Sequence, residues 1–297
     1  MAGSAHAAVL GSPIGHSKSP ALHSAAYRHL GVDIAYKAIE MTPERLGAFM
    51  HGLRTDSSCR GLSVTMPLKS AMMQYVDRLS EPASTLGVIN TVTFDDGGSS
   101  PRLTGHNTDV AGIIRAIGHA GGTNERSAAV LGAGGTSLAA TAALAALGIE
   151  QLRLCVRDPE RAADTVRLAE DSGMQVDVVP LQESPAMLRE AKVVVSTLPP
   201  HAADSIAAVP ELSRPVDGGA GILLDVAYDP WPSALARTWR ARGGVIVPGL
   251  EMLLYQGVEQ VRMFTGNSFH DEAGVINAMC DAVGLPRRDP DLPDMAG

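Results

Sequence analysis

The segment Ser127–Ile149 carries no charged residue, and it constrains the fold of this chain more than any other feature. An uncharged run of this length could cross a bilayer as a single helix. Small and polar residues interrupt the run, namely Gly132, Gly134, Gly135, Thr136 and Ser137. We therefore expect a buried strand, a glycine turn and a buried helix in series rather than a membrane span.

Short apolar runs continue beyond this segment and alternate with helix-like stretches. The strand-like runs are AAVLGA, QLRLCV, QVDVVP, VVVSTLP, ILLDVAY and GGVIVPG, and charges are sparse within them. Continuous apolar runs are typical of parallel strands that helices cover on both faces. The pattern predicts a doubly wound, Rossmann-type α/β domain over residues 109–247.

The first hundred residues show a second α/β alternation. Strand-like HAAVLGSPI, YKAIEM and CRGLSVTMP alternate with helix-like SPALHSAAYRHLG, TPERLGAFMHGL and LKSAMMQYVDRL. VINTVTF and PRLTG flank DDGGSS, whose composition predicts an exposed hairpin loop. We expect a separate α/β domain over residues 1–108, and a loosely ordered tail, PRRDPDLPDMAG, after Gly284.

The balance of charge argues against a nucleic-acid partner. The chain has 24 basic and 32 acidic residues, a net charge of −8, and no basic stripe. Such a surface repels a phosphate backbone over most of its area. We therefore expect no nucleic-acid partner. A membrane partner is not expected either, and monomer and homodimer both remain open.

The cysteines and histidines indicate a reducing compartment and no metal site. Cys59, Cys155 and Cys280 are widely spaced and form no C-x-x-C pair, and Cys155 in its apolar run is expected to be buried. His16 and His23 have no second ligand set at metal spacing. The N-terminal MAGSAHAAVLG lacks the features of a signal peptide, so we expect a cytoplasmic location.

The turn at Gly132 and Gly134 is a candidate nucleotide site. Glycines at the end of a strand let the backbone approach a pyrophosphate, and the following helix N-terminus supplies free N–H groups. Position six of the dinucleotide fingerprint is Ser137 rather than glycine or alanine, so the match is imperfect. A glycine turn where two backbones merely pack closely remains the alternative.

Arg157 follows the next strand, QLRLCV, where NAD-binding proteins usually have an acidic residue. An arginine there favours the 2'-phosphate of NADP, and Arg161 could add a second charge-assisted contact. Asp158 could bind the ribose in the manner typical of NAD sites. Because Pro159 follows it, Asp158 is also a candidate helix N-cap, and we therefore favour NADP over NAD.

Polar side chains follow two strands of the first domain. Ser17 and Ser19 precede a helix, where Ser19 could be a simple N-cap or the two hydroxyls could hold a carboxylate. Thr65 ends the strand of LSVTMPLK, and Lys69 is expected in the first turn of a helix that begins at Pro67.

Two further polar positions stand out along the chain. Asp109 is expected to begin the next helix, where it could be a cap. Gln256 lies off the apolar stripe of its predicted helix, which leaves it free to face a ligand.

The motifs SPIGHSKSP, SVTMPLK, GVINT, NTDVAG, GAGG and GLEMLLYQG occur in this order along nearly the whole chain. In this combination the chain resembles the shikimate dehydrogenase family. The resemblance implies NADP-dependent, reversible reduction of 3-dehydroshikimate to shikimate, a step toward aromatic amino acids. It also implies a split substrate domain, to which residues 248–297 return.

The resemblance assigns roles position by position. Lys69 and Asp109 would be the catalytic pair, with Lys69 exchanging the proton on the reacting oxygen. The substrate-binding positions would be Ser17, Ser19, Thr65, Asn90, Tyr228 and Gln256. The cofactor-binding positions would be Glu81, Gly132, Ala133, Gly134, Gly135, Thr136, Arg157, Asp158, Arg161, Val226 and Gly249.

Two positions depart from the family pattern. Ser63 stands where the family commonly has asparagine, and Val156-Arg157-Asp158 replaces a frequent Asn-Arg-Thr. The second departure keeps the arginine but removes two polar partners. An NAD-dependent quinate or shikimate dehydrogenase therefore remains an alternative, as does a catalytically silent nucleotide sensor with the same fold.

Overall fold

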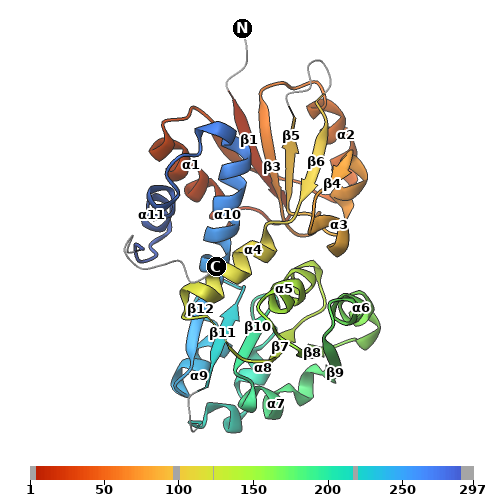
Figure 1. Cartoon of the computed structure of the whole chain (residues 1–297), viewed down its shortest axis with the longest axis vertical. Helices are drawn as coiled ribbons and strands as arrows, with labels where there is room; N and C mark the ends of the chain where they lie inside the picture. The colour runs from red at the N-terminus through yellow and green to blue at the C-terminus, as the bar shows by residue number, and fades with distance from the viewer. Residues whose placement is uncertain (1–4, 96–100, 123, 217–219, 289–297) are drawn as a thin grey trace. The chain divides into compact units, whose positions relative to one another are not determined.

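The computed structural model describes residues 5–95, 101–122, 124–216 and 220–288 (Figure 1). The chain divides into two compact units. Unit 1 contains residues 1–108 and 253–293, and unit 2 contains residues 109–252 and 294–297. The C-terminal helices of the described chain therefore pack with the N-terminal residues.

Unit 1 is built on a six-stranded sheet of order β2-β1-β3-β5-β6-β4. Its strands are β1 His6–Gly11, β2 Ala35–Glu40, β3 Cys59–Val64, β4 Arg78–Leu79, β5 Thr91–Phe94 and β6 Leu103–His106. β1, β2 and β3 run parallel, whereas β5 is antiparallel to both β3 and β6. The predicted pairing of VINTVTF with PRLTG is therefore confirmed, although most of the DDGGSS loop lies outside the described residues.

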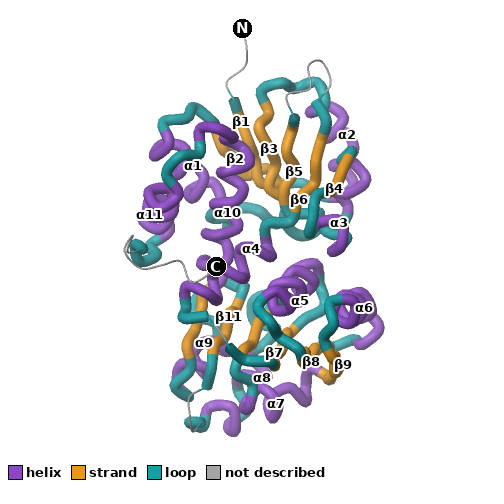
Figure 2. Tube along the Cα trace, in the orientation of Figure 1, coloured by secondary structure: helices purple, strands orange, loops and turns teal. Residues whose placement is uncertain are grey.

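Helices lie on both faces of this sheet, as Figure 2 shows. α1 Ser19–Leu30, α10 Gly249–Thr265 and α11 Glu272–Val283 lie on one side, and α2 Pro43–Leu53 and α3 Ala83–Leu86 lie on the other. α10 approaches β3 closely because position 61 is glycine: a Cβ at Gly61 would collide with the ring of Phe264. This close approach brings the polar side chains of α10 to the middle of the sheet.

The segment LKSAMMQYVDRL is not the helix that its apolar spacing predicts. It forms a turn, a 3-10 helix Ala71–Tyr75 and the short strand β4. Leu68 and Met72 are buried four residues apart, which explains the helical pattern. The Lys69 carbonyl, however, accepts a hydrogen bond from Ile89 N at 3.1 Å instead of an intrahelical one. Lys69 therefore lies in a turn, and the expected helix beginning at Pro67 is not formed.

Unit 2 is the predicted doubly wound fold. Its six parallel strands have the order β12-β11-β10-β7-β8-β9. They are β7 Ser127–Leu131, β8 Gln151–Val156, β9 Gln175–Pro180, β10 Val193–Ser196, β11 Ile222–Asp225 and β12 Val245–Pro248. The helices of this unit are α4 Asp109–His119, α5 Gly135–Ala146, α6 Ala163–Asp171, α7 Ser184–Glu190, α8 Asp204–Ala207 and α9 Ala234–Ala241.

The uncharged segment Ser127–Ile149 forms β7, a glycine turn and α5, as expected. Within the described residues, no helix is both long and apolar enough to span a membrane. Strand order reverses beside β7, since β10 pairs on one side of it and β8 on the other. In doubly wound folds, ligands bind beyond the carboxyl ends of the strands at such a reversal.

Candidate functional site

The candidate substrate residues of unit 1 converge at one edge of its sheet. Ser17 follows β1, Thr65 follows β3, and Thr108 follows β6, so all three leave carboxyl ends of strands. Asn90 precedes β5, whose antiparallel direction brings its start to the same edge. Backbone bonds fix this edge, since Val64 N donates to Asn90 O at 2.7 Å and Asn90 N donates to His106 O at 3.0 Å.

The serine loop, defined as residues 12–19, joins β1 to α1. Ser19 is the first residue of α1 and caps nothing; the N-cap position is Lys18, so the simple capping interpretation is wrong. Instead Ser17 Oγ accepts a hydrogen bond from Ser19 N at 3.3 Å, and the Ser19 hydroxyl is hydrogen-bonded to the Tyr36 phenol. Ser17 is half-buried and Ser19 is buried.

Thr65 and Lys69 lie on the turn that follows β3, and both are half-buried. Thr65 N donates to Leu10 O at 2.9 Å, which ties this turn to the end of β1. Position 11 must be glycine for the two to approach, because a Cβ there would collide with the Thr65 methyl group. The bond from Ile89 N to the Lys69 carbonyl places the lysine backbone beside the residue that precedes Asn90.

Asn90 is buried in a set of side-chain hydrogen bonds with Thr108 and Gln256. Its Oδ1 accepts from Thr108 N at 2.8 Å, and its Nδ2 donates to Thr108 Oγ1 at 2.9 Å and to Gln256 Oε1 at 3.3 Å. The backbone N–H of Thr108 therefore determines which way the Asn90 amide points. Gln256 is only 6% exposed and makes these bonds from α10. Asp109, which follows Thr108, begins α4 as predicted and is buried.

The glycine turn of unit 2 has a backbone conformation that favours glycine at Gly132 and leaves open space at Gly134. Gly132 has φ +111°, a conformation that side chains rarely adopt, and a Cβ there would lie 2.5 Å from Thr197 Oγ1. Gly134 precedes α5 and has open space where a Cβ would be. The first turn of α5 contains no acidic residue. Ser137, the imperfect position of the fingerprint, is buried and donates from Oγ to Gly134 O at 2.6 Å, which holds the turn.

The side chains around the second strand of unit 2 are exposed. Arg157, Asp158 and Arg161 all lie on the surface after β8. Asp158 Oδ1 accepts from Glu160 N at 3.1 Å and caps the 3-10 helix Pro159–Ala162. The capping interpretation of Asp158 is thus confirmed.

Comparison with known proteins is decisive for the family. A family model described as shikimate dehydrogenase substrate binding domain matches residues 9–92, and one described as shikimate 5'-dehydrogenase C-terminal domain matches residues 249–268. The shikimate dehydrogenase (NADP(+)) of Rubrobacter xylanophilus is 39% identical over 262 residues, covering 87% of this chain and 89% of that protein. The chain belongs to the shikimate dehydrogenase family.

Solved structures of the shikimate dehydrogenase family share the fold. The Mycobacterium tuberculosis shikimate dehydrogenase superposes with a TM-score of 0.79 at 34% identity, covering 93% of this chain and 99% of that one. A Thermus thermophilus shikimate 5-dehydrogenase in complex with NADP(H) and shikimate gives a TM-score of 0.75 at 32% identity, with 94% and 99% covered.

A buried carboxylate that the sequence analysis missed supports the loop after β11. Asp225 Oδ2 accepts from Ser233 Oγ at 2.6 Å, and its Oδ1 accepts from Ala227 N at 3.4 Å. Burial raises the pKa of this carboxyl. The loop carries two family positions, Val226 and the half-buried Tyr228. The aspartate at the start of DVAYDP was the available signal, because a carboxylate at the end of an apolar strand needs partners.

The remaining family positions have local partners. Gly249 begins α10, and a Cβ there would collide with the Val226 carbonyl, so glycine is required for this close approach. Glu81 is exposed and accepts hydrogen bonds from Ser84 and from Thr85 Oγ1 at the start of α3, which hold the pKa of its carboxyl below the usual range. The Glu81 carboxylate is therefore held by two hydroxyl groups of α3 in this structure.

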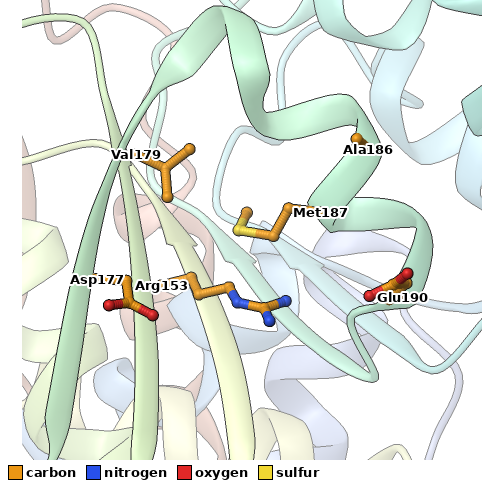
Figure 3. A pocket seen from close by; sticks show the side chains of 6 residues that line it. All are labelled: Arg153, Asp177, Val179, Ala186, Met187 and Glu190. Atoms are coloured by element: carbon orange, nitrogen blue, oxygen red, sulfur yellow. The ribbon is translucent and has the colours of Figure 1, made fainter.

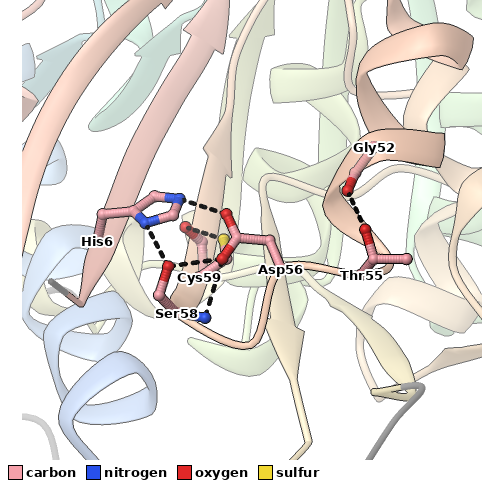
Figure 4. Close-up of polar contacts among 7 residues, drawn as sticks. His6, Gly52, Thr55, Asp56, Ser58 and Cys59 are labelled. Carbon is pink, nitrogen blue, oxygen red and sulfur yellow. Dashed lines mark hydrogen bonds and ion pairs between the residues drawn. The ribbon is translucent and has the colours of Figure 1, made fainter. Parts of the chain in front are cut away.

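A serine, a histidine and an aspartate also meet at the opposite edge of the unit 1 sheet (Figure 4). His6 Nε2 lies 3.4 Å from Asp56 Oδ2, and Ser58 Oγ lies 3.2 Å from His6 Nδ1. The Ser58 hydroxyl donates to Asp56 Oδ1 at 2.5 Å. Because its proton goes to the carboxylate, the histidine does not activate this serine as a nucleophile, and the group stabilises the turn before β3.

A pocket of about 450 Å³ lies between β8, β9 and α7 of unit 2 (Figure 3). Its lining residues are Arg153, Asp177, Val179, Ala186, Met187 and Glu190. None of the family's substrate or nucleotide positions is among them. Among the described residues, no group of three or more histidine, cysteine or carboxylate side chains could hold a metal ion.

Deep burial of His23 makes the stability of this chain depend on pH. The ring is 0% exposed, stacks on Tyr36 with centroids 4.0 Å apart, and has a pKa that burial lowers to about 3. An unfolded histidine titrates near 6.5, so the unfolded chain gains a proton that the folded chain does not as pH falls below that value. Stability present above pH 6.5 is therefore lost progressively toward pH 3.

We expect His23→Gln to weaken this pH dependence. Between pH 7.5 and 5.5, His23 should account for a loss of about 1.4 kcal/mol in the free energy of unfolding, which the variant lacks. Denaturant unfolding at the two pH values measures the difference. His51→Gln, a change at an exposed histidine, should keep the wild-type dependence. Equal pH dependence in wild type and His23→Gln would contradict the assignment.

Proposed function

We propose that this chain catalyses the NADP-dependent, reversible reduction of 3-dehydroshikimate to shikimate. The observation that carries the proposal is its similarity, over nearly the whole chain, to relatives named shikimate dehydrogenase (NADP(+)). The convergence of the serine loop, Lys69 and Asn90 at one sheet edge supports it, because a hydroxylated ring carboxylate needs both an anion site and hydroxyl partners.

Residues 1–108 and 248–297 then bind the substrate. Ser17 and Ser19 hold the carboxylate, and Thr65, Asn90 and Gln256 bind the ring hydroxyls. The resemblance adds Tyr228, from outside these two ranges, as a further substrate-binding position. Lys69, with Asp109 as its partner, exchanges the proton on the reacting oxygen, and a positioned acid or base contributes roughly 10² to 10⁴-fold.

Residues 109–247 hold the nucleotide, which when bound would supply the hydride as NADPH and accept it as NADP in the reverse direction. The Gly132–Thr136 turn fits the pyrophosphate, because Gly134 leaves open space and α5 presents its free N–H groups there. Arg157 and Arg161 meet the 2'-phosphate, and Val226 and Gly249 are further cofactor-binding positions. We place the activity in the cytoplasm, where Cys59, Cys155 and Cys280 would stay reduced as in this structure.

An absorbance assay at the nicotinamide band tests the proposal. Purified protein with shikimate and NADP should produce NADPH, and the same protein with quinate or NAD should turn over more slowly. Tight NADP binding with no turnover on shikimate would instead indicate the nucleotide sensor. Faster turnover with NAD and quinate would indicate the quinate dehydrogenase.

We expect Ser17→Ala to raise the KM for shikimate about five- to tenfold with little change in kcat. A lost hydroxyl bond to the carboxylate costs about 1 kcal/mol, and it is lost from the ground and transition states alike. Steady-state kinetics at saturating NADP measures the split. Ser172→Ala, at an exposed serine of unit 2, is the control. A fall in kcat at unchanged KM would remove Ser17 from the carboxylate site.

A further inference from the structure

Gln260 lies at the centre of the polar interior of unit 1. It is 1% exposed and stands one helical turn after Gln256 on α10, so the two amides share one face of that helix. No family motif of the sequence analysis includes it. Its amide oxygen and its amide nitrogen nevertheless make hydrogen bonds to two different parts of the candidate substrate site.

The amide oxygen of Gln260 is linked to the serine loop by a series of hydrogen bonds. Ser63 Oγ donates to Gln260 Oε1 at 2.7 Å, and Tyr36 OH donates to Ser63 Oγ at 2.6 Å. The Tyr36 phenol is in turn hydrogen-bonded to the Ser19 hydroxyl. Ser63, the residue that departs from the family pattern, is therefore a link between Ser19 and Gln260.

The neighbouring histidine fixes the orientation of this amide. His23 Nε2 lies 3.2 Å from Gln260 Oε1, and His23 Nδ1 lies 3.1 Å from Tyr27 OH. A neutral ring that donates from Nε2 and accepts at Nδ1 satisfies both contacts. Gln260 Oε1 thus accepts from both Ser63 and His23, and the amide nitrogen must point the other way.

The amide nitrogen of Gln260 is linked to the hydrogen-bonded side chains of Asn90, Thr108 and Gln256. Gln260 Nε2 donates to Thr91 Oγ1 at 2.9 Å and to Asn90 O at 3.3 Å. The Thr91 hydroxyl donates to Asn90 Oδ1 at 2.8 Å. The side chain of Asn90, which bonds Gln256 and Thr108, is therefore held through Thr91 by the same glutamine.

We propose that Gln260 is a positioning residue that joins the carboxylate-binding end and the hydroxyl-binding end of the substrate site into one hydrogen-bonded unit. The chain runs from Ser19 through Tyr36 and Ser63 to Gln260, and from there through Thr91 to Asn90. Each hydroxyl has one proton to donate, so a rotation at one end changes the partner available at the next. The identity of the two ends rests on the proposed function.

A kinetic double-mutant cycle tests this coupling. Ser19→Ala and Asn90→Ala are made singly and together, in wild type and in Gln260→Met, and kcat/KM for shikimate is measured. In wild type the two losses should be non-additive by about threefold to tenfold, as for residues of one hydrogen-bond network. In Gln260→Met they should be additive. Gln74→Met, at an exposed glutamine of unit 1, should keep the wild-type coupling.

Two further measurements test the proposal if Gln260→Met folds poorly or if activity is absent. Ser63→Ala breaks only the arm to Ser19 and should also abolish the coupling, so a poorly folding Gln260→Met variant does not end the test. Tyr36→Phe and Thr91→Val form a second cycle, read from denaturant unfolding, which needs no activity.

The outcomes of the two cycles are distinct. If wild type fails to turn over shikimate, the proposed function fails, and the unfolding cycle alone decides on Gln260. Additive losses in the wild-type kinetic cycle, or coupling that survives both Gln260→Met and Ser63→Ala, would overturn the proposal. So would an unfolding cycle whose coupling is the same in wild type and Gln260→Met.

Discussion

Replacing Lys69 with alanine is expected to lower kcat at least about 10²-fold while leaving the KM for NADP nearly unchanged. The ammonium group is the proposed proton donor to the ketone oxygen, and general acid catalysis contributes roughly 10² to 10⁴-fold. Lys69 lies on the half-buried turn after β3 in unit 1, whereas the glycine turn and Arg157 belong to unit 2. Steady-state kinetics with shikimate, varying each substrate in turn, measures both parameters.

A matched substitution separates this loss from a general effect of charge. Lys37 is an exposed lysine of β2, and Lys37→Ala should keep wild-type kcat. Thermal unfolding of both variants shows whether the turn after β3 is intact. A folded Lys69→Ala variant that retains kcat would remove the lysine from the proposed mechanism.

The architecture of unit 2 was predictable because its signals are local. Its strands are continuous apolar runs, and each one occurs in the structure within a few residues of the expected place. The glycine turn could also be predicted from local sequence, since the φ of +111° at Gly132 is a backbone conformation that favours glycine. Ser137, an apparent defect of the fingerprint, proved to be compatible because its hydroxyl bonds back to Gly134.

The turn at Lys69 and the role of Ser19 could not be predicted from neighbouring residues. Apolar side chains at Leu68 and Met72 follow a helical spacing, but the backbone N–H of Ile89, in the loop before β5, donates to the Lys69 carbonyl. Ser19 stands where an N-cap is expected, yet its hydroxyl bonds Tyr36 on β2. In both cases a tertiary hydrogen bond decides against the local preference.

The hydrogen-bonded chain through Gln260 could not be predicted from local sequence patterns, because its members are distant in sequence. Ser63 and Gln260 are 197 positions apart in sequence, and Gln260 and Thr91 are 169 apart. A glutamine within a helix is ordinarily compatible with an exposed face. Only the close approach of α10 to β3, which Gly61 permits, buries this one among polar partners.

The choice of nucleotide should depend on Arg157. We expect Arg157→Ala to weaken NADP binding roughly 10 to 100-fold, since a charge-assisted hydrogen bond is worth about 1.5 to 3 kcal/mol. NAD binding should barely move, because NAD has no 2'-phosphate for the guanidinium to meet. Arg157 is exposed after β8, so its removal should leave the fold intact. Fluorescence titration with both nucleotides measures the two affinities, and Arg153→Ala, at an exposed arginine within β8, is the control.

Asp158→Asn completes the test, because an arginine and a carboxylate that bound the nucleotide here would favour NADP and NAD respectively. Asp158 caps the following 3-10 helix through Glu160 N, and asparagine caps nearly as well, so this variant should keep both the NADP preference and the stability. A carboxylate that bound the ribose hydroxyls would behave differently, since its neutral amide would weaken NAD binding selectively. A wild-type protein that prefers NAD, with Arg157→Ala silent and Asp158→Asn damaging, would therefore identify NAD as the cofactor.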